Sequence, residues 1–530
     1  MTEVTRRTFM SSIGAGALGL GAMAQSRVNT AGATTPAGYP HAGRNSNEGR
    51  RPHVIVFFTD DQSAHLGCLG TPGIATPHID GLAREGVLFD NGFASSASCA
   101  PSRCALLTGM HCHANGVWRN VHTPTIDAPE EDLGPETRFR EIEPVGVHED
   151  IPTLPELLNE AGYYTGITDK FHLSPMWKFP FQHRYTNTVS DEIKAAFRQF
   201  LDARDDRPFF IMANINWTHR PFMRPAVERW DLPLPDTAQV DVPGYLADTP
   251  LMRADLAEYY HTVELCDLTV AAYLEVLEEM GLYEDTLLFF TSDQGFCYHR
   301  AKATAYDKGI RVPFIVKPPA AQPARHSRAL VSHLDIMPTI LDYAEVDIPD
   351  GVHGQSLRPL LTAGDDPLDW RDYVFAEHNA HGPNPLEYYP TRAVWDGRFH
   401  YIRHLMHERT WDGDPASLLD MDGDLPAEIM FAGPADAFPT RGWGNRAYEA
   451  AIRGREAFPV QYRILESIFR RDHEELYDLH TDPEELHNLA EDAPHQDHLR
   501  RLRAAVDAWM DETDDPGIET RNVPRRTGDG

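Results

Sequence analysis

The hydrophobic positions of this chain form short continuous runs, and several runs are followed at once by polar residues. The run His53–Thr59 reads HVIVFFT and is followed by Asp60 and Asp61. Because apolar and polar positions do not alternate in it, the run predicts a strand buried on both faces, as in a parallel sheet. Three more runs have the same form. Tyr163–Ile167 precedes Lys170 and His172, Pro208–Ala213 precedes His219, and Thr286–Thr291 precedes Asp293 and Gln294. Ligands of open α/β sheets bind outside the carboxyl ends of the strands, so we expect these polar residues at one sheet edge.

Helical spacing of apolar residues separates these runs. Thr153–Ala161 and Leu256–Met280 show this spacing, and Gly281 follows the second at the usual capping position. Asp335–Tyr343 predicts another helix. Strands and helices that alternate in this way predict an α/β core, which we assign to residues 51–370.

The pattern changes beyond residue 370, where shorter strand-like segments replace the long runs. A helix is predicted near the end of the chain, at Gln496–Met510. This composition predicts a smaller α+β domain over residues 371–515 and a polar tail over residues 516–530. The strand-like segments are Tyr373–Ala376, Arg392–Trp395 and Phe399–Ile402.

The N-terminus has the pattern of an export signal. Arg6 and Arg7 precede the small apolar run Ile13–Ala24, which ends in an Ala-Met-Ala cleavage pattern. Paired arginines before a weakly hydrophobic stretch predict a twin-arginine (Tat) signal over residues 1–24, with the Tat translocon as partner. The polar residues 25–50 predict a linker. No later segment approaches transmembrane length. From the signal we expect an exported protein, periplasmic or extracellular.

Charge and cysteine spacing exclude several classes of function. The 530 residues carry a formal net charge of −32 and only six lysines, which argues against binding to nucleic acid or to anionic lipid. The six cysteines show no CxxC spacing, which argues against a zinc site or a redox pair. A disulfide is compatible with export, but the spacing defines no pairing.

The segment Cys99-Ala-Pro-Ser-Arg103-Cys-Ala-Leu-Leu-Thr-Gly109 is the most informative part of the chain. It resembles the sulfatases, whose signature is Cys-x-Pro-Ser-Arg followed by Leu-Thr-Gly. The resemblance implies an alkaline phosphatase-like fold: a large, mixed, mostly parallel sheet flanked by helices, and a smaller C-terminal domain with a short antiparallel sheet. It also implies that a formylglycine-generating enzyme oxidises Cys99 to formylglycine (3-oxoalanine).

The chemistry that formylglycine supplies in this family explains the modification. Its aldehyde hydrates to a geminal diol, and one hydroxyl attacks sulfur to form a covalent sulfate hemiester. The second hydroxyl then expels sulfate by C–O cleavage, so water need not attack the hindered anion. Pro101 and Ser102 suit a helix start, where backbone N–H groups stabilise an anion.

A metal site is predicted from residues more than two hundred positions apart. Asp60, Asp61, Asp293 and Gln294, with the diol oxygen at position 99, form an all-oxygen ligand set. Such a set suits a hard cation and disfavours zinc. By resemblance these residues match the calcium ligands of the family, so we expect Ca²⁺ in preference to Mg²⁺. Gln294 departs from the family pattern, in which asparagine or histidine is usual.

Cationic residues match the remaining active-site positions of the family. The resemblance implies that Arg103 and Lys170 neutralise sulfate oxygens, whereas His172 accepts the proton of the second hydroxyl. It also implies that His219 and Lys302 hold the bridging atom and protonate the leaving group. Two of the six lysines thus fall on catalytic positions. Asp169 stands before Lys170 where the family usually has glycine.

Softer motifs resemble the N-sulfoglucosamine sulfohydrolase (sulfamidase) branch, and the likeness extends over roughly residues 50–495. The branch implies N-sulfated glucosamine at a glycan end as substrate. Two alternatives stay open: a phosphoester or phosphonate monoester hydrolase of the same superfamily, and a non-catalytic glycan-binding protein if Cys99 is unmodified. The motifs are His111–Gly116, Arg300–Tyr306, Arg371–His378 and Glu475–Leu479, and the candidate sugar contacts are His113, Asn115, Trp118, His378 and His381.

Overall fold

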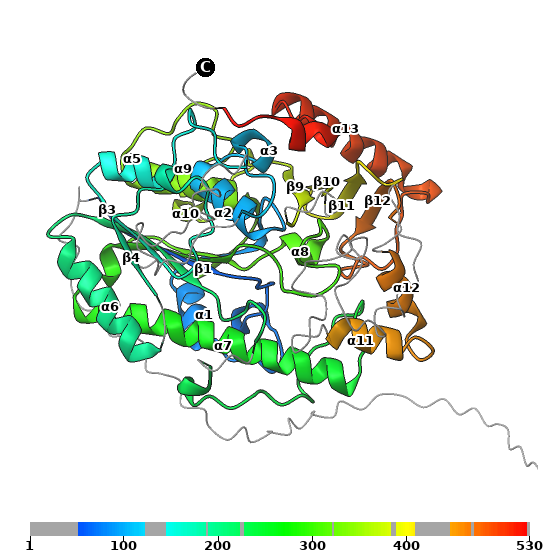
Figure 1. Cartoon of the computed structure of the whole chain (residues 1–530), viewed down its shortest axis with the longest axis horizontal. Helices are drawn as coiled ribbons and strands as arrows, with labels where there is room; N and C mark the ends of the chain where they lie inside the picture. Colours follow the sequence, from blue (N-terminus) through cyan, green and yellow to red (C-terminus); the bar gives the residue numbers. More distant parts are fainter. Residues whose placement is uncertain are drawn as a thin grey trace, which may run out of the picture. The chain divides into compact units, whose positions relative to one another are not determined.

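The computed structural model describes most of the chain after residue 50 (Figure 1). The predicted signal and linker lie outside the described residues, and residues 47–530 form one compact unit. Part of the predicted polar tail is described and contains the 3-10 helix η12, Gly517–Asn522. The described ranges are 51–121, 145–186, 189–222, 227–320, 323–382, 388–408, 446–467 and 471–526.

Eight strands form a large sheet in the order β4-β3-β5-β1-β6-β7-β2-β8. Neighbouring strands are parallel except at β7, which runs antiparallel to β6 and β2. The predicted mixed, mostly parallel sheet is therefore confirmed. Its strands are β1 His53–Thr59, β2 Val87–Phe93, β3 Tyr164–Thr168, β4 His183–Tyr185, β5 Phe209–Ile215, β6 Thr286–Ser292, β7 Phe314–Lys317 and β8 Arg325–Ser332.

The four continuous apolar runs form four adjacent strands, β3, β5, β1 and β6. Strand β1 has the predicted bounds, and the other three begin at the predicted residue or one residue later. Strands β2, β4, β7 and β8 were not predicted. β4 has only three residues and β7 only four, while both β2 and β8 include exposed polar positions, so none of them forms a long apolar run.

Helices cover both faces of the sheet, as the absence of alternation in β1 requires. Ile55 and Phe57 pack with helices α1, α6 and α7, whereas Val54 and Val56 pack with α2, α5, α9 and α10 on the opposite face (Figure 1). The bounds are α1 Pro77–Arg84, α6 Ser190–Ala203, α7 Pro250–Glu279, α2 Cys99–Thr108, α5 Leu154–Glu160, α9 Ile336–Tyr343 and α10 Arg358–Thr362.

Helix α7 is longer than its apolar spacing predicted, because it begins six residues earlier. Pro250 occupies the first turn, and the Thr249 side chain caps the helix by accepting a hydrogen bond from the backbone N–H of Met252. Gly281, with φ of +67°, lies just beyond the end of the helix, as expected. The capping residues, rather than the apolar pattern, therefore fix the start of α7.

A second, antiparallel sheet of four strands, in the order β12-β11-β10-β9, includes the strand-like segments beyond residue 370. Helix α13 covers it, and its residues pack against β10 and β11. The strands are β9 Val374–Ala380, β10 Tyr388–Trp395, β11 Phe399–His404 and β12 Glu474–Asp478; the remaining helices are α3 Cys112–Asn115, α8 Asp307–Ile310, α11 Arg446–Arg453, α12 Pro459–Ser467 and α13 Gln496–Glu512.

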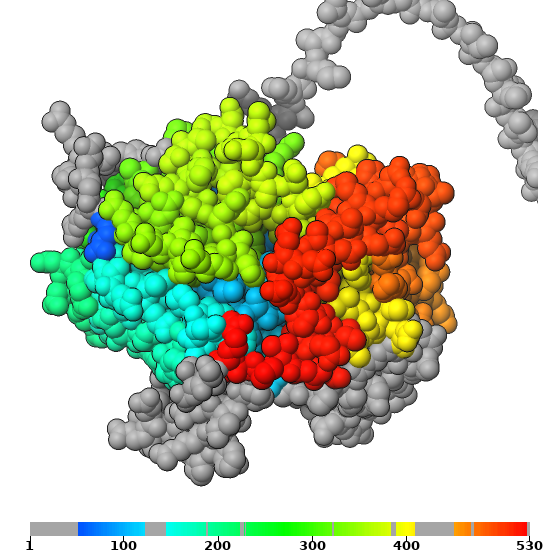
Figure 2. Space-filling model, turned by 90° about the horizontal axis from the view of Figure 1, so that it is seen from above, coloured from blue at the N-terminus to red at the C-terminus, as the bar shows by residue number. Residues whose placement is uncertain are grey.

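The C-terminal segment also packs against the helices near residue 100. The indole N–H of Trp509 in α13 donates to His111 Nε2 at 3.1 Å, and the backbone N–H of Arg526 donates to His148 Nδ1 at 2.9 Å. Figure 2 shows the red C-terminal residues beside the blue and cyan segments that they contact. These contacts fix the end of the chain next to α2 and α3.

Within the described ranges, no helix combines the length and apolarity needed to cross a membrane. All six cysteines are described and none forms a disulfide. Five of the six are buried, so these thiols are part of the hydrophobic core.

A glycine contact fixes the segment that carries Lys302. A Cβ atom added to Gly309 in α8 would lie 2.2 Å from the carbonyl oxygen of Ala301 and 2.4 Å from that of Thr304. Both oxygens belong to the backbone, so a side chain at residue 309 forces the segment to move. Glycine is therefore required for this close approach.

We expect Gly309→Ala to lower the free energy of unfolding by about 1–3 kcal/mol, because the extra methyl group overpacks a rigid backbone contact. Gly364→Ala is the matched control, since a Cβ atom there meets nothing within 4 Å. Urea unfolding of both variants tests the expectation. Equal transition midpoints would contradict the inferred close contact.

Candidate active site

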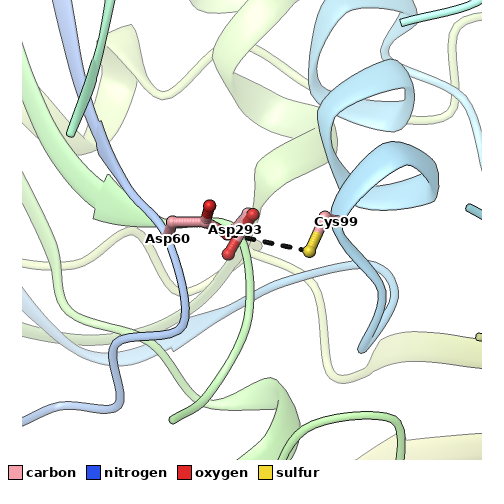
Figure 3. A group of neighbouring side chains, drawn as sticks. All are labelled: Asp60, Cys99 and Asp293. Carbon is pink, nitrogen blue, oxygen red and sulfur yellow. Dashed lines mark hydrogen bonds between the residues drawn. The ribbon is translucent and has the colours of Figure 1, made fainter. Parts of the chain in front are cut away.

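The carboxyl ends of β1 and β6 bring together the predicted metal ligands. The two strands pair in parallel, and the backbone N–H of Asp61 donates to Asp293 Oδ1 at 3.0 Å. Cys99 begins α2 opposite them, with its Sγ atom 3.6 Å from Asp60 Oδ1. Figure 3 shows the carboxylates of Asp60 and Asp293 close to this thiol. All these residues, and Gln294, are buried. The structure thus assembles the five positions at one sheet edge.

The carboxylates form an electrostatically strained group. Burial and the charge of Asp60 raise the pKa of Asp293 to about 7. Burial also disfavours ionisation of Asp60, but the charges of Lys170, His219 and Arg103 hold the pKa of Asp60 well below its usual value. The opposite directions reflect the repulsion between the two neighbouring carboxylates, which favours ionisation of Asp60 over that of Asp293. An additional cation would stabilise the ionised form of both groups.

The donor set fits a hard cation. Oxygens of Asp60 and Asp293 and the sulfur of Cys99 lie within 4.8 Å of one another. The Gln294 amide nitrogen contacts Asp61 Oδ1 and lies 3.2 Å from Cys99 Sγ, while its Oε1 atom is buried without a hydrogen-bond partner. Turning the amide by half a rotation directs Oε1 to the same point as the carboxylates. Oxygen ligands of this kind suit Ca²⁺.

Cys99 is poorly suited to act as a thiolate. Burial raises the pKa of its thiol far above the usual range, so the unmodified side chain stays protonated at neutral pH. Its backbone is held on both sides: Ser98 lies at the N-cap position of α2 in an extended conformation, and the N–H of Ala100 donates to Asn120 Oδ1 at 2.9 Å. A nucleophile at residue 99 therefore requires different chemistry from that of a free cysteine.

Three predicted cationic residues bind the carboxylates directly. Arg103 is fully buried, and one of its NH groups donates to Asp293 Oδ2 at 2.9 Å. Lys170 donates to Asp60 at 2.7 Å, and Lys302 donates to Asp61 at 2.8 Å. Asp60 raises the pKa of Lys170 despite the opposing effect of burial, so this ammonium group stays charged.

The two predicted histidines differ in their contacts. His219 Nδ1 donates to the carbonyl of Arg220 at 2.7 Å, and its Nε2 lies 3.4 Å from Lys302 Nζ and 3.9 Å from Asp61 Oδ2. Burial and the charges of Lys170 and Arg103 hold the pKa of His172 well below its usual value, so this imidazole is neutral near pH 7.

The backbone conformation of Asp169 accounts for the glycine that sulfatases usually have before this lysine. Its φ is +50° and that of His172 is +43°, both in the left-handed region that favours glycine. This backbone turn directs Lys170 to Asp60. An aspartate at residue 169 therefore has a cost in backbone free energy, while the ammonium group of Lys170 still pairs with Asp60.

The candidate sugar contacts fall into two groups. His378 Nδ1 and His381 Nδ1 lie 3.4 Å and 3.3 Å from Ser98 Oγ, in the residue before Cys99. His113 instead pairs with Glu377 at 2.9 Å, and the Asn115 amide bonds to Thr108 and to backbone groups inside the fold.

Trp118 is only partly buried and packs edge-on against Tyr388, with ring centroids 5.6 Å apart. The two histidines near Ser98 are therefore the members of the predicted set that lie next to residue 99.

Sequence reasoning missed two asparagines that position the site. Asn214 accepts from Arg103 at 2.7 Å and donates to the carbonyls of Thr168 and Lys170, both at 2.9 Å. Its signal was a single amide directly after the predicted run Pro208–Ala213, which the structure includes in β5. Asn120, which binds the N–H of Ala100, has no distinguishing sequence context.

Comparison with known proteins identifies the family to which this chain belongs. The sulfatase family model matches residues 52–346, and the model "N-sulphoglucosamine sulphohydrolase, C-terminal" matches residues 296–430. Human N-sulphoglucosamine sulphohydrolase (Homo sapiens) is 30% identical over 508 residues, with 88% of this chain and 92% of that protein aligned.

Solved structures show the same fold. A phosphonate monoester hydrolase from Silicibacter pomeroyi aligns with a TM-score of 0.60 at 18% identity, covering 87% of this chain and 96% of that chain. A protein solved with its substrate D-glucosamine-2-N,6-O-disulfate aligns with a TM-score of 0.57 at 20% identity, covering 89% and 100%. The predicted alkaline phosphatase-like fold is confirmed. Because the sulfatase model matches more than half of the residues and the human relative aligns over most of its length, the chain belongs to the sulfatase family of sulfuric ester hydrolases.

Proposed function

We propose that this protein hydrolyses a sulfate ester or sulfamate of a sulfated glycan, with formylglycine made from Cys99 as nucleophile and Ca²⁺ as the bound cation. The observation that carries the proposal is the position of Cys99, which faces Asp60, Asp293 and Gln294 at the start of α2. The diol of formylglycine supplies both an attacking and an expelling hydroxyl. Ca²⁺ supplies positive charge for the sulfate oxygens.

Asp60, Asp61, Asp293 and Gln294 would hold the cation, and Mg²⁺ suits this crowded set less well than Ca²⁺. Because Arg103 is already bonded to Asp293 and Asn214, it fixes the carboxylate in place and adds positive charge near sulfate.

Residues around the carboxylates can serve as proton acceptor and proton donor in the reaction. His172 is neutral and has a buried Nδ1 atom without a hydrogen-bond partner, so it suits the role of proton acceptor. Lys302 Nζ and His219 Nε2 lie 3.4 Å apart, and these two residues are the candidates to give a proton to the leaving group. Lys170 neutralises sulfate from its position on Asp60.

N-sulfated glucosamine is the substrate that we propose. The support is the match of residues 296–430 to a C-terminal N-sulphoglucosamine sulphohydrolase model and the 30% identity to the human protein of that name. His378 and His381, beside Ser98, are the sugar contacts that we favour. We also propose export through the Tat translocon, supported by Arg6 and Arg7, and prior modification by a formylglycine-generating enzyme.

We expect mass spectrometry of protein from its native host to show oxygen in place of sulfur and two hydrogens at residue 99. Cys99→Ala should lower sulfate release by at least about 10³-fold, because the nucleophile is lost. Cys99→Ser should accept sulfate but release it slowly, since serine has one hydroxyl.

Cys104→Ala, in the same helix, is the control and should keep both modification and turnover. An unmodified thiol at residue 99 in active native protein would refute the proposed nucleophile. In inactive protein it would favour the non-catalytic glycan-binding alternative.

We expect Ca²⁺ added to chelator-treated protein to raise the thermal unfolding midpoint. A ligand at about one hundred times its Kd adds about 2.7 kcal/mol to stability. Asp293→Ala should remove this gain, whereas Asp347→Ala, an exposed acid after α9, should keep it. Calorimetry with Ca²⁺ and Mg²⁺ measures the effect, and the same gain in both variants would place the cation elsewhere.

We expect glucosamine N-sulfate to be hydrolysed with a higher kcat/KM than glucosamine 6-O-sulfate, an aryl sulfate or a phosphodiester assayed in parallel. The reason is that sugar contacts beside Ser98 stabilise the transition state only for a substrate that they fit. Ion chromatography measures the sulfate released, and the alcohol released together with the phosphomonoester measures cleavage of the phosphodiester. A preference for the phosphodiester would reverse the proposal in favour of the phosphoester or phosphonate hydrolase alternative.

A further inference from the structure

A buried carboxylate on helix α7 binds the loops that follow strands β5 and β6. Asp255 accepts hydrogen bonds from Arg220 Nη1 at 3.1 Å and from Arg220 Nη2 at 2.5 Å, so the two groups form a two-point ion pair. The Tyr298 hydroxyl donates to Asp255 Oδ2 at 2.8 Å. All three side chains are buried, and they come from three different parts of the chain.

The charge of Arg220 is used inside the protein. Its Nε atom donates to the backbone carbonyl of Cys297 at 3.4 Å, and its guanidinium carbon lies 4.3 Å from the centre of the Phe222 ring. Burial opposes ionisation of this guanidinium, but the charge of Asp255 outweighs burial and raises the pKa of Arg220. Because all three guanidinium nitrogens already have acceptors, Arg220 fixes protein segments and is not a contact for the substrate.

The loop after β5 places His219 through a direct hydrogen bond. The backbone carbonyl of Arg220 accepts from His219 Nδ1 at 2.7 Å, so the position of this carbonyl sets the orientation of the imidazole ring. The other ring nitrogen, Nε2, lies 3.4 Å from Lys302 Nζ and 3.9 Å from Asp61 Oδ2. A shift of the Arg220 backbone therefore moves Nε2 relative to the carboxylates and to Lys302.

The loop after β6 places Lys302 by means of a closed turn. The backbone N–H of Lys302 donates to the carbonyl of Phe296 at 3.2 Å, and that of Ala301 donates to the carbonyl of Tyr298 at 3.1 Å. Tyr298 therefore belongs to the same hydrogen-bonded turn as Lys302, and its hydroxyl holds this turn on α7. The single carboxylate of Asp255 thus holds both loops.

We infer that Asp255 is a positioning residue for proton transfer to the leaving group. Its ion pair with Arg220 orients His219, and its bond from Tyr298 holds the turn that carries Lys302. The inference rests on the proposed function, in which these two residues give a proton to the leaving group. It extends the site to helix α7, which packs on the face of the sheet opposite α2.

The test compares two leaving groups, because a misplaced proton donor affects only a leaving group that needs a proton. The amine of glucosamine N-sulfate must be protonated as it departs, whereas 4-nitrophenyl sulfate releases a stable phenolate. The measured quantity is kcat/KM of the full chain with Ca²⁺, which reports the step in which the leaving group departs. We expect Asp255→Asn to lower kcat/KM about 10²-fold for glucosamine N-sulfate and less than about threefold for the aryl sulfate.

Asp267→Asn is the matched control. Asp267 is also a buried carboxylate of α7, but it binds His78 and the backbone N–H of Ile79 instead of the active-site loops. This variant should keep the wild-type ratio of the two kcat/KM values. Tyr298→Phe removes one hydroxyl without leaving a buried charge unpaired, so it should fold and should change the ratio in the same direction as Asp255→Asn, by a smaller factor.

A double variant tests whether Asp255 acts through His219. In a His219→Ala background, Asp255→Asn should add little further loss for glucosamine N-sulfate, because the imidazole that it orients is already absent. Independent losses that multiply in the double variant would overturn the inference. An equal loss for both substrates in Asp255→Asn would show a general structural defect and would overturn it as well.

Crystal structures of the variants give a readout that does not depend on turnover. Asp255→Asn should lose the hydrogen bond from His219 Nδ1 to the carbonyl of Arg220, whereas Asp267→Asn should keep it. An imidazole that stays in place in Asp255→Asn would overturn the inference. A wild-type protein that releases no sulfate from either substrate would count against the proposed function, so the two failures are told apart.

Discussion

The burial of paired charges at one sheet edge constrains the rest of this structure. Asp60, Asp61 and Asp293 lie in a water-poor centre where an unpaired carboxylate would cost several kcal/mol. Each is held by a cationic partner from a different part of the chain: Lys170 after β3, Lys302 before α8, and Arg103 in α2. Because those partners must reach the same point, the strand order, the start of α2 and the segment packed on Gly309 are all fixed by this one requirement.

The C-terminal sheet is joined to this centre through a second buried network. Glu377 in β9 binds His113 at 2.9 Å, and Arg392 in β10 binds Asp515 beyond α13. Burial opposes ionisation of both groups of the first pair, yet the pKa of Glu377 is held well below its usual value and that of His113 is raised. The pair is therefore charged and bonded, which ties β9 to α3. His378, the residue after Glu377, is thereby held beside Ser98.

The sequence predicted those parts of the site that depend on continuous apolar strands. The residues after β1, β3, β5 and β6 could be placed at one edge because buried parallel strands leave a clear pattern. Asn214 could not be assigned, since an amide inside a strand gives no sign of the arginine that it meets. Asn120 and the contact of Trp509 with His111 depend on tertiary packing between segments far apart in sequence. The start of α7 was missed for a local reason, because capping by Thr249 extends a helix beyond its apolar stripe.

Because the whole chain is acidic, binding of an anionic substrate depends on where individual cationic side chains lie. A sulfated saccharide is repelled by a surface of net negative charge, and screening weakens that repulsion over about 8–10 Å in physiological salt. Recognition therefore depends on cations within contact distance of the anion. Lysine and arginine both pair buried carboxylates at this centre: Lys170 and Lys302 bind Asp60 and Asp61, and Arg103 binds Asp293. Since a guanidinium group carries several donors, an arginine that already pairs a carboxylate still brings positive charge to contact distance of a sulfate oxygen.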